Sequence, residues 1–281
     1  MGYQVEETPH GIWIGISHGF FNRVPLYETA PPTQGEIRSL FRCYPILGLH
    51  YALPPGSRGK PSYGYFVRDR DYDLKHLHRK SRKGVRRGLE NCQVRPMGFD
   101  ELYHLGPPLN RDTLARQGRD DPTLSQPERW ARFCQAGEQV EGAQVWGAFV
   151  SDELAAYVTL FRIDGVVNLL HQNSRTSLMK LYPNPALNFT VTQNMMRTPG
   201  VQAVFSGPAG HWSSPGLDAY KRHMGYLKDP VVFAVQLRPV VKHLLLSQWG
   251  RRIISALGCR LSGKGLCQSV KAILEVAALS S

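Results

Sequence analysis

The chain has 281 residues, of which 42% are hydrophobic, and its 34 Lys and Arg against 22 Asp and Glu give a formal net charge of +12. This length allows one large core or two modest ones, since domains usually contain about 100–200 residues. No apolar run of roughly 18 residues is present, and the start of the chain has no charged segment followed by an apolar one, so neither a membrane span nor a secretory signal is indicated and a cytoplasmic protein is predicted.

The N-terminal part of the chain reads as a short α/β unit. Strands are predicted over 12–16 and 48–53, and a helix over 34–43 follows a Pro-Pro-Thr cluster that is typical of a helix start. The Pro-, Gly- and Ser-rich stretch 53–64 predicts a loop, with a strand over 65–68 after it. Residues 1–70 are therefore predicted to form a first domain.

A basic segment follows, RDRDYDLKHLHRKSRKGVRR at residues 68–87, with nine Lys or Arg against three Asp. On a helix that begins near Asp73, an apolar or small face and a basic face are predicted on opposite sides. The first holds Leu74, Leu77, Ser81, Val85 and Leu89, and the second holds Lys75, Arg79, Arg82, Lys83 and Arg86. Two interpretations stay open: a solvated charged face, or attraction of a polyanion such as tRNA, a nucleotide phosphate or a membrane surface.

The central part of the chain predicts an α+β fold with a mixed central sheet. A strand over 93–96 and a helix over 99–105 precede a polar stretch without clear period, and a helix is predicted over 130–138. Strands over 145–150, 154–163 and 166–172 form an antiparallel meander, whose second turn is the hairpin dipeptide Asp164-Gly165. A helix over 185–197, a strand over 201–206, a helix that contains Lys221 and a strand over 231–237 complete the sheet.

The last segment, 239–281, is predicted to be a helical hairpin. Apolar residues alternate there with Lys, Arg and His, and a Ser-Gly-Lys-Gly turn at 262–265 separates two helices. Packing onto the N-terminal part is the preferred interpretation, and a basic helix at a membrane surface or a dimer contact is left open.

Several motifs together resemble the FemAB superfamily, which includes the peptidoglycan-bridge aminoacyltransferases and the BioF2-like acyltransferases. They are the basic helix YDLKHLHRKSRKGVRRGLE, the helix start LYPNPALNF, the strand VQAVFSG and the closing GLDAYKRHMGY. The resemblance covers residues 72–238, about 60% of the chain, and depends on the order and spacing of these motifs. It implies a GNAT-like acetyltransferase domain over 71–238, with residues 1–70 as a truncated N-terminal half.

The resemblance also implies site residues. Lys221 matches the lysine that contacts the donor end in FemAB-type enzymes, and we expect it to stabilise charge on the reacting carbonyl. The alternative is that Lys221 is an exposed lysine on a helix surface without a functional role. Tyr220, directly before it, is expected to shape the donor channel.

The segment LYPNPALNF lies where the acetyltransferase superfamily carries its phosphate-binding loop. Tyr182 and Asn184 are candidate contacts to the donor, but the two prolines leave few free amides for a pyrophosphate. Asn184 is also predicted to cap the helix, with Pro185 at the first helical position.

Polar residues that follow two neighbouring strands complete the candidate site. Ser206 and Gly207 end one strand, and His171 and His211 are candidate bases for the amine proton because the imidazole pKa lies near neutrality. A plain surface histidine and a turn glycine are the alternatives. Arg82 and Arg86 of the basic helix are candidate contacts to an anionic donor.

The predicted function is an N-acyltransferase that moves an acyl group from a thioester, on coenzyme A or a carrier protein, to an amine of a small-molecule, peptide or sugar acceptor. An aminoacyl-tRNA-dependent aminoacyltransferase and a non-catalytic protein that binds anions or nucleic acid are the alternatives, with tRNA or a carrier protein bound through residues 74–90. Acyl-coenzyme A would be a co-substrate, and no tightly bound cofactor is expected. Five cysteines without a CxxC pattern predict neither a disulfide framework nor a metal site.

Overall fold

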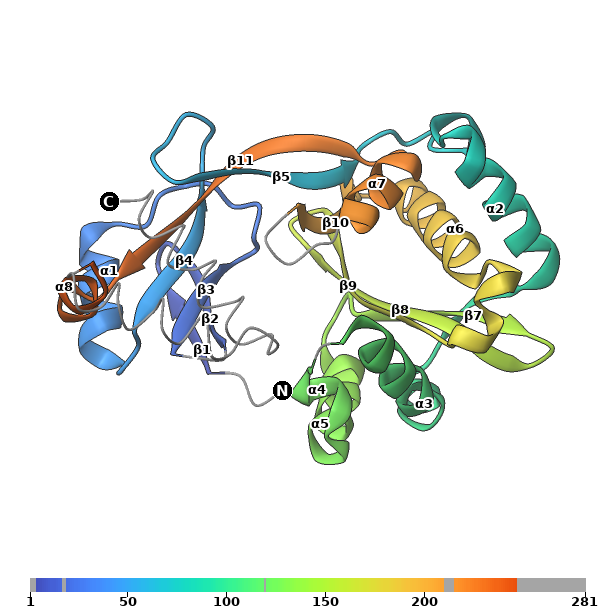
Figure 1. Ribbon diagram of the computed structural model, residues 1–281, viewed down its shortest axis with the longest axis horizontal. Coiled ribbons are helices and arrows are strands. Elements are labelled where there is room, and N and C mark those ends of the chain that lie inside the picture. The colour runs from blue at the N-terminus through green and yellow to red at the C-terminus, as the bar shows by residue number, and fades with distance from the viewer. Residues whose placement is uncertain (1–3, 17–18, 119, 210–214, 247–281) are drawn as a thin grey trace. The chain divides into compact units, whose positions relative to one another are not determined.

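The computed structural model describes residues 4–16, 19–118, 120–209 and 215–246 (Figure 1). The chain forms two compact units. Unit 1 consists of Met1–Gly2, Tyr65–Gly207 and Ser214–Lys228, and unit 2 consists of Tyr3–Gly64, Pro208–Ser213 and Asp229–Ser281. The predicted domain boundaries at residues 70 and 238 stay predictions. The two units divide the chain differently, because most of β11 (Leu227–Leu237) belongs to the same unit as the N-terminal strands.

Unit 1 has a mixed sheet with helices on both faces, so the predicted α+β class is confirmed. The strand order is β5-β10-β9-β8-β7-β6, with β9 and β10 parallel and β6 to β9 antiparallel. The strands are β5 (Lys60–Val67), β6 (Gln93–Met97), β7 (Gln144–Val150), β8 (Glu153–Ile163), β9 (Val166–Ser174) and β10 (Ala203–Ala209). The helices are η1 (Leu74–His76), α2 (Arg79–Asn91), α3 (Phe99–Gln117), α4 (Pro122–Ser125), α5 (Pro127–Gln139), η2 (Thr176–Leu181), α6 (Pro183–Arg197) and α7 (Pro215–His223).

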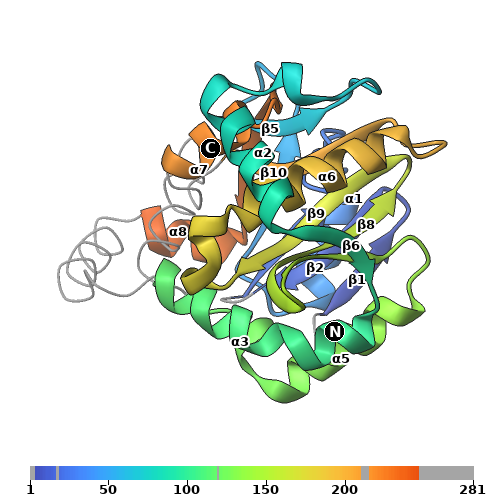
Figure 2. The same cartoon turned by 90° about the vertical axis from the view of Figure 1, so that its right-hand side faces the viewer.

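The predicted meander is confirmed in β7, β8 and β9. Its two turns place Ser151 and Asp152, and then Asp164 and Gly165, at positive φ, as tight hairpin connections require. Helices α3 and α5 cover one face of this sheet, and α2 and α6 lie on the other (Figure 2). The core on the α3 side includes Trp130, Phe133 and Tyr157.

Unit 2 has the strand order β1-β2-β3-β4-β11. Its elements are β1 (Val5–Thr8), β2 (Gly11–Ile16), β3 (Phe20–Val24), α1 (Gln34–Cys43), β4 (Gly48–Leu53), β11 and α8 (Pro239–Leu246). Helix α1 begins with a capping box, in which Thr33 and Glu36 each accept a backbone N–H of the other. The buried Glu36 carboxylate also accepts the indole N–H of Trp13 at 2.7 Å, which ties α1 to β2.

Some sequence predictions were wrong in their bounds. The basic helix begins at Arg79 rather than near Asp73, because a separate 3-10 turn occupies 74–76. Leu89, predicted on its apolar face, is 43% exposed, and the buried face consists of Gly84, Val85 and Gly88. Helix α3 continues to Gln117 instead of ending at 105, and β1 and β3 were not predicted.

The predicted hairpin over 239–281 is described only in its first part. Helix α8 begins at Pro239, as predicted, and residues 247–281 lie outside the described residues. No helix in the described part of the chain is long and apolar enough to cross a bilayer.

Candidate functional site

The site lies where β9 and β10 separate. These parallel strands pair over three residue pairs, which end at Asn168 and Phe205. Beyond that point β9 continues beside β8 as far as Ser174, while β10 continues to Ala209. Ser206 and Gly207 are the first residues of β10 past the last pair, although the strand does not end there as predicted but continues to Ala209. Ligands commonly bind at such points in a sheet, where neighbouring strands end or diverge.

Lys221 brings a buried ammonium group to this point. It lies on α7 and is only 7% exposed. Its Nζ lies 5.1 Å from the centre of the Tyr65 ring on β5. A Cβ added to Gly207 would be 3.5 Å from the same nitrogen, an ordinary van der Waals contact, so Gly207 lies directly beside the ammonium. The interpretation of Lys221 as an exposed helix lysine is therefore wrong.

The surroundings of Lys221 change its proton affinity. Burial, which penalises the charged form, lowers its pKa to about 8, and the neighbouring Asp218 carboxylate opposes that shift. At pH 7 a group with this pKa is roughly nine-tenths protonated. The site therefore holds a cation at neutral pH that loses its proton within an accessible pH range.

Tyr220 and Asn184 connect α7 to the start of α6. The Tyr220 hydroxyl donates to the Asn184 carbonyl at 3.4 Å, and burial raises the pKa of this half-buried tyrosine, so the hydroxyl keeps its proton. The Asn184 side chain donates to Ser174 Oγ at 3.0 Å and accepts from Gln172 at 3.4 Å. Asn184 thus ties the end of β9 to α6 and α7.

The prediction that Asn184 caps α6 was wrong. The helix begins two residues earlier than predicted, at Pro183 instead of Pro185, and its N-cap is Tyr182, which has the left-handed backbone conformation (φ 61°). Proline suits a first helical position because its φ is fixed and it has no N–H to satisfy. Asn184 is therefore already helical, and its side chain is directed to β9 rather than to the free amides.

The start of α6 is a poor cradle for a pyrophosphate. A helix N-terminus binds phosphate through free backbone N–H groups, and Pro183 and Pro185 have none. The N–H of Ala186 already donates to the Tyr182 carbonyl at 3.3 Å. Only the Asn184 amide is left in this first turn.

Tyr182 supports the packing of α2 on α6. A Cβ at Gly84 would lie 3.3 Å from its ring, and one at Gly88 would lie 2.4 Å from its carbonyl oxygen. The two glycines of α2 therefore allow this helix to approach α6 closely. Arg87 lies above the Tyr182 ring at 6.0 Å.

The two candidate histidines are not brought together with Lys221 in the described residues. His171 lies on β9, and its ring makes an edge contact with Phe133 of α5, at 5.3 Å between centroids. It therefore belongs to the sheet face covered by α3 and α5, opposite α6 (Figure 2). His211 lies outside the described residues.

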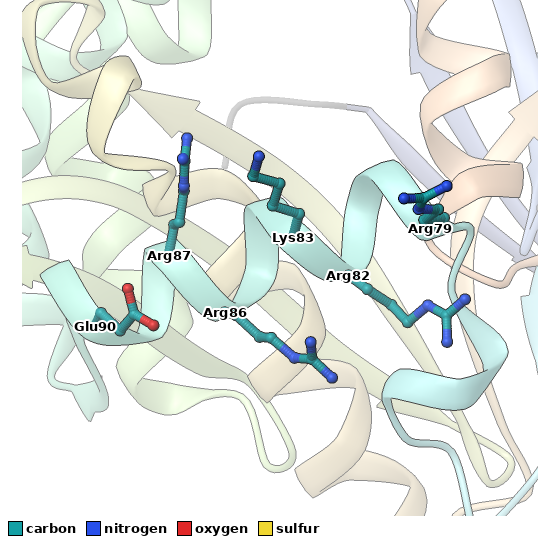
Figure 3. A pocket seen from close by; sticks show the side chains of 6 residues that line it. All are labelled: Arg79, Arg82, Lys83, Arg86, Arg87 and Glu90. Carbon is teal, nitrogen blue, oxygen red and sulfur yellow. The ribbon is translucent and has the colours of Figure 1, made fainter.

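Arg82 and Arg86 lie on the outer side of α2, with Arg79, Lys83, Arg87 and Glu90 around a hollow of about 570 Å³. Figure 3 shows Lys83 and Arg87 directed to one side of the helix and Arg82 and Arg86 to the other. These arginines form a cationic surface on α2 and do not contact Lys221.

Tyr65 is the site residue that sequence reasoning missed. It is fully buried and lies more than 150 positions before Lys221 in the chain. The alternating pattern around it predicts a strand, which the structure confirms. No local pattern pairs this strand with the helix of Lys221.

Known structures share this fold. The C-terminal domain of a putative lysylphosphatidylglycerol synthetase from Agrobacterium fabrum matches with a TM-score of 0.59 and 12% identity over 88% of this chain and 90% of that chain. FemX matches with a TM-score of 0.57 and 10% identity over 88% and 91%. L-PGS from Bacillus licheniformis matches with a TM-score of 0.55 and 11% identity over 93% and 90%. No protein-family model matches the chain, and no curated protein matches its sequence.

At identities of 10–12% these matches define a fold. The chain shares the fold of FemX and of the lysylphosphatidylglycerol synthetase domain, which agrees with the fold that the motif resemblance predicted.

Proposed function

We propose that this protein transfers an acyl group from an activated donor to an amine, with the reacting carbonyl held beside Lys221. The observation that carries the proposal is a buried ammonium at the point where β9 and β10 separate. The likeness of fold to FemX and to lysylphosphatidylglycerol synthetase, whose name describes a product that carries a lysyl group, supports the same class of reaction.

The chemistry follows from the position of this cation. The amine nitrogen attacks the carbonyl carbon, the oxygen becomes an oxyanion, and the bond to the leaving sulfur or oxygen then breaks while the amine loses a proton. A buried ammonium stabilises the oxyanion more strongly than an exposed one, because water does not screen it. Lys221 is well placed for this role as a cation, and nothing in its surroundings requires it to act as a nucleophile.

The amine proton needs an acceptor. The His171 ring packs on the face opposite α6, which argues against it. We therefore propose His211, four residues past Gly207 in the sequence, as the base that takes this proton.

A thioester on a carrier protein is the donor we favour. A coenzyme A thioester would place its pyrophosphate at the start of α6, where two prolines remove the amides that usually bind it. A carrier protein is bound through its own protein surface and needs no phosphate contact at this helix start, so it fits better as a donor. Ser206, Gly207 and Tyr220 are proposed to line the path of the acyl group.

An aminoacyl ester of tRNA is the second candidate donor. The cationic surface of α2 favours it, since phosphate contacts by Lys and Arg supply much of the affinity for nucleic acids. The alternative of a protein that binds anions without catalysis would share that surface and would show no turnover.

The test is a turnover assay with three donors: acetyl-coenzyme A, an acylated carrier protein and aminoacyl-tRNA, each with a mixture of amino acids and amino sugars. Release of free thiol or of deacylated tRNA is measured for the wild-type chain, for Lys221→Met and for the exposed neighbour variant Arg222→Met. We expect turnover with the carrier thioester or with tRNA, lost in Lys221→Met and kept in Arg222→Met. Absence of turnover with every donor would support the non-catalytic alternative.

A further inference from the structure

The outer face of α2 carries positive charge that the described part of the protein does not neutralise. None of Arg79, Arg82, Lys83 and Arg86 forms an ion pair with a carboxylate of the described residues. Glu90 is the one acidic residue that lines this hollow. Like charges on adjacent turns of a helix repel one another, so this arrangement costs stability in the isolated chain.

The cationic face is held in a fixed position relative to the helix of Lys221. Gly84 and Gly88 let α2 pack closely on Tyr182 and Ala186 of α6. At its other end, the His78 N–H donates to the His223 carbonyl at 2.9 Å, and the two imidazole rings stack with centroids 4.4 Å apart. His223 is two residues from Lys221, so a partner bound along α2 begins next to the proposed site.

An apolar element adjoins the charge. Arg82, Arg86 and Leu89 follow one another at four- and three-residue steps, so they lie along one side of α2. Leu89 is 43% exposed and belongs to a second hollow of about 370 Å³. The hollow is otherwise lined by the buried Cys92 and Phe149 and by five polar residues, Glu90, Asn91, Gln93, Ser151 and Asp152. The cationic side of α2 is thus followed by one exposed apolar side chain, that of Leu89.

From these features we propose that the outer face of α2 docks an acidic, amphipathic helix of a partner protein. Carboxylates of that helix meet Arg82 and Arg86, and one of its apolar side chains packs on Leu89. The inference rests on the proposed function in one respect, since the partner it names is the protein that carries the acyl thioester.

The mixed character of this surface favours a protein over a nucleic acid. Single-stranded nucleic acids are usually bound by exposed aromatic rings together with Lys and Arg. Among the described residues that line the two hollows, the only aromatic side chain is that of Phe149, which is buried. An exposed leucine beside two arginines gains nothing from a phosphate backbone, whereas helix-in-groove recognition between proteins uses such apolar anchors.

The experiment measures binding by calorimetric titration of the full chain with three probes. They are a purified acidic acyl carrier protein, total tRNA, and vesicles that contain phosphatidylglycerol, at about 0.05 M and 0.15 M salt. The variants are the charge reversal Arg82→Glu/Arg86→Glu and the apolar change Leu89→Ser. The matched control is Arg129→Glu/Arg132→Glu, which makes the same change of charge on exposed positions of α5.

We expect the carrier protein to bind, with a loss of affinity of about tenfold or more in the charge reversal and a smaller loss in Leu89→Ser. The control should bind like the wild type. Binding of tRNA or of vesicles alone, unaffected by Leu89→Ser, would overturn the proposal in favour of that partner. No binding to any probe would overturn it too.

Turnover of a small acyl thioester that has no carrier is recorded in parallel for the wild type and for Lys221→Met. Turnover without carrier binding would reject the docking surface and leave the proposed function standing. Carrier binding without turnover would reject the proposed function and leave the docking surface standing.

Discussion

The ammonium nitrogen of Lys221 lies 5.1 Å from the centre of the Tyr65 ring, and both side chains are buried. An aromatic face attracts a cation, and this attraction partly offsets the cost of removing the ammonium from water. Burial nevertheless lowers the pKa of Lys221 to about 8. A buried charge of this kind is unfavourable for stability and common in sites that act on charge.

Lys221→Met should therefore stabilise unit 1 at pH 7. The folded-state pKa of Lys221 lies below the unfolded value, so the unfolded chain binds more protons between pH 8 and 10.5, and wild-type stability rises with pH across that window. The gain in the variant should be up to about 3 kcal/mol at pH 7 and should shrink towards pH 10. Melting temperatures of both proteins at the two pH values test this, and a variant that melts lower at pH 7 would count against it.

The rate of acyl transfer should fall as pH rises above about 8, because Lys221 acts in its protonated form. The profile of kcat/KM against pH measures this loss. In Lys221→Arg the falling limb should disappear, whatever the remaining rate, since a guanidinium keeps its charge. If kcat/KM of Lys221→Arg still falls above pH 8, the fall is caused by the titration of another group.

Gly207→Ala should reduce both stability and activity. Gly207 has a φ of 81°, which costs an alanine about 1–2 kcal/mol, and its new Cβ would lie 3.5 Å from Lys221 Nζ. The control is Gly56→Ala, at a similar φ of 86° with nothing within 4 Å of the added Cβ. The control should lose stability and keep the wild-type kcat; an equal loss of kcat in both variants would refute the role of Gly207 beside the ammonium.

Gly88→Ala should loosen α2 from α6. The added Cβ would lie 2.4 Å from the Tyr182 carbonyl oxygen and 2.9 Å from the Ala186 Cβ, so the helices must move apart. A net cost of about 1–2 kcal/mol is expected, after the better helix propensity of alanine offsets part of the overpacking. Chemical denaturation measures it, with exposed Lys80→Ala on the same helix as the control. Unchanged stability in Gly88→Ala would mean that close packing of these helices is not needed.

Acid should destabilise unit 2 through His50. Burial lowers the pKa of this histidine to about 4, so between pH 6.5 and 4 the unfolded chain binds the extra proton and stability falls as pH falls. His50→Gln should reduce that acid sensitivity by roughly 1–2 kcal/mol, a moderate value because the ring is only half-buried. Denaturation midpoints at pH 7 and pH 4.5 compare the two proteins, and parallel losses in both would exclude His50 as the cause.

Local sequence signals predicted the bounds of some elements of unit 2. Helix α1 and the strand 48–53 have the predicted bounds, and the Pro-Pro-Thr cluster that marked the helix start supplies its N-cap, Thr33. The predicted helix ended too early, at residue 105, because the buried face of α3 includes Asn110 and Thr113, which interrupt the hydrophobic period. Their side chains are satisfied by distant partners: Asn110 bonds to the Leu124 carbonyl and Tyr157, and Thr113 to the backbone of Ser174.

Local sequence signals also named some residues of the candidate site but not the contacts between them. Lys221 and Tyr220 could be named because the closing motif of a known family carries them, and Gly207 because it ends the strand VQAVFSG. Their contacts could not, since Tyr65 and Asn184 reach them across the sheet. The sequence also could not show that His171 is directed to the opposite face, because a bulge in β8 and β9 shifts the register beside it.

The most direct test of the central claim is the single-turnover rate of acyl transfer by Lys221→Met, compared with the wild type and with Arg222→Met. Loss of a group that stabilises an oxyanion typically costs about 100- to 1,000-fold in rate. A loss of that size in Lys221→Met, with Arg222→Met near the wild-type rate, is the predicted result. A Lys221→Met rate within about twofold of the wild type would contradict the account, because the reaction would then proceed without the buried cation.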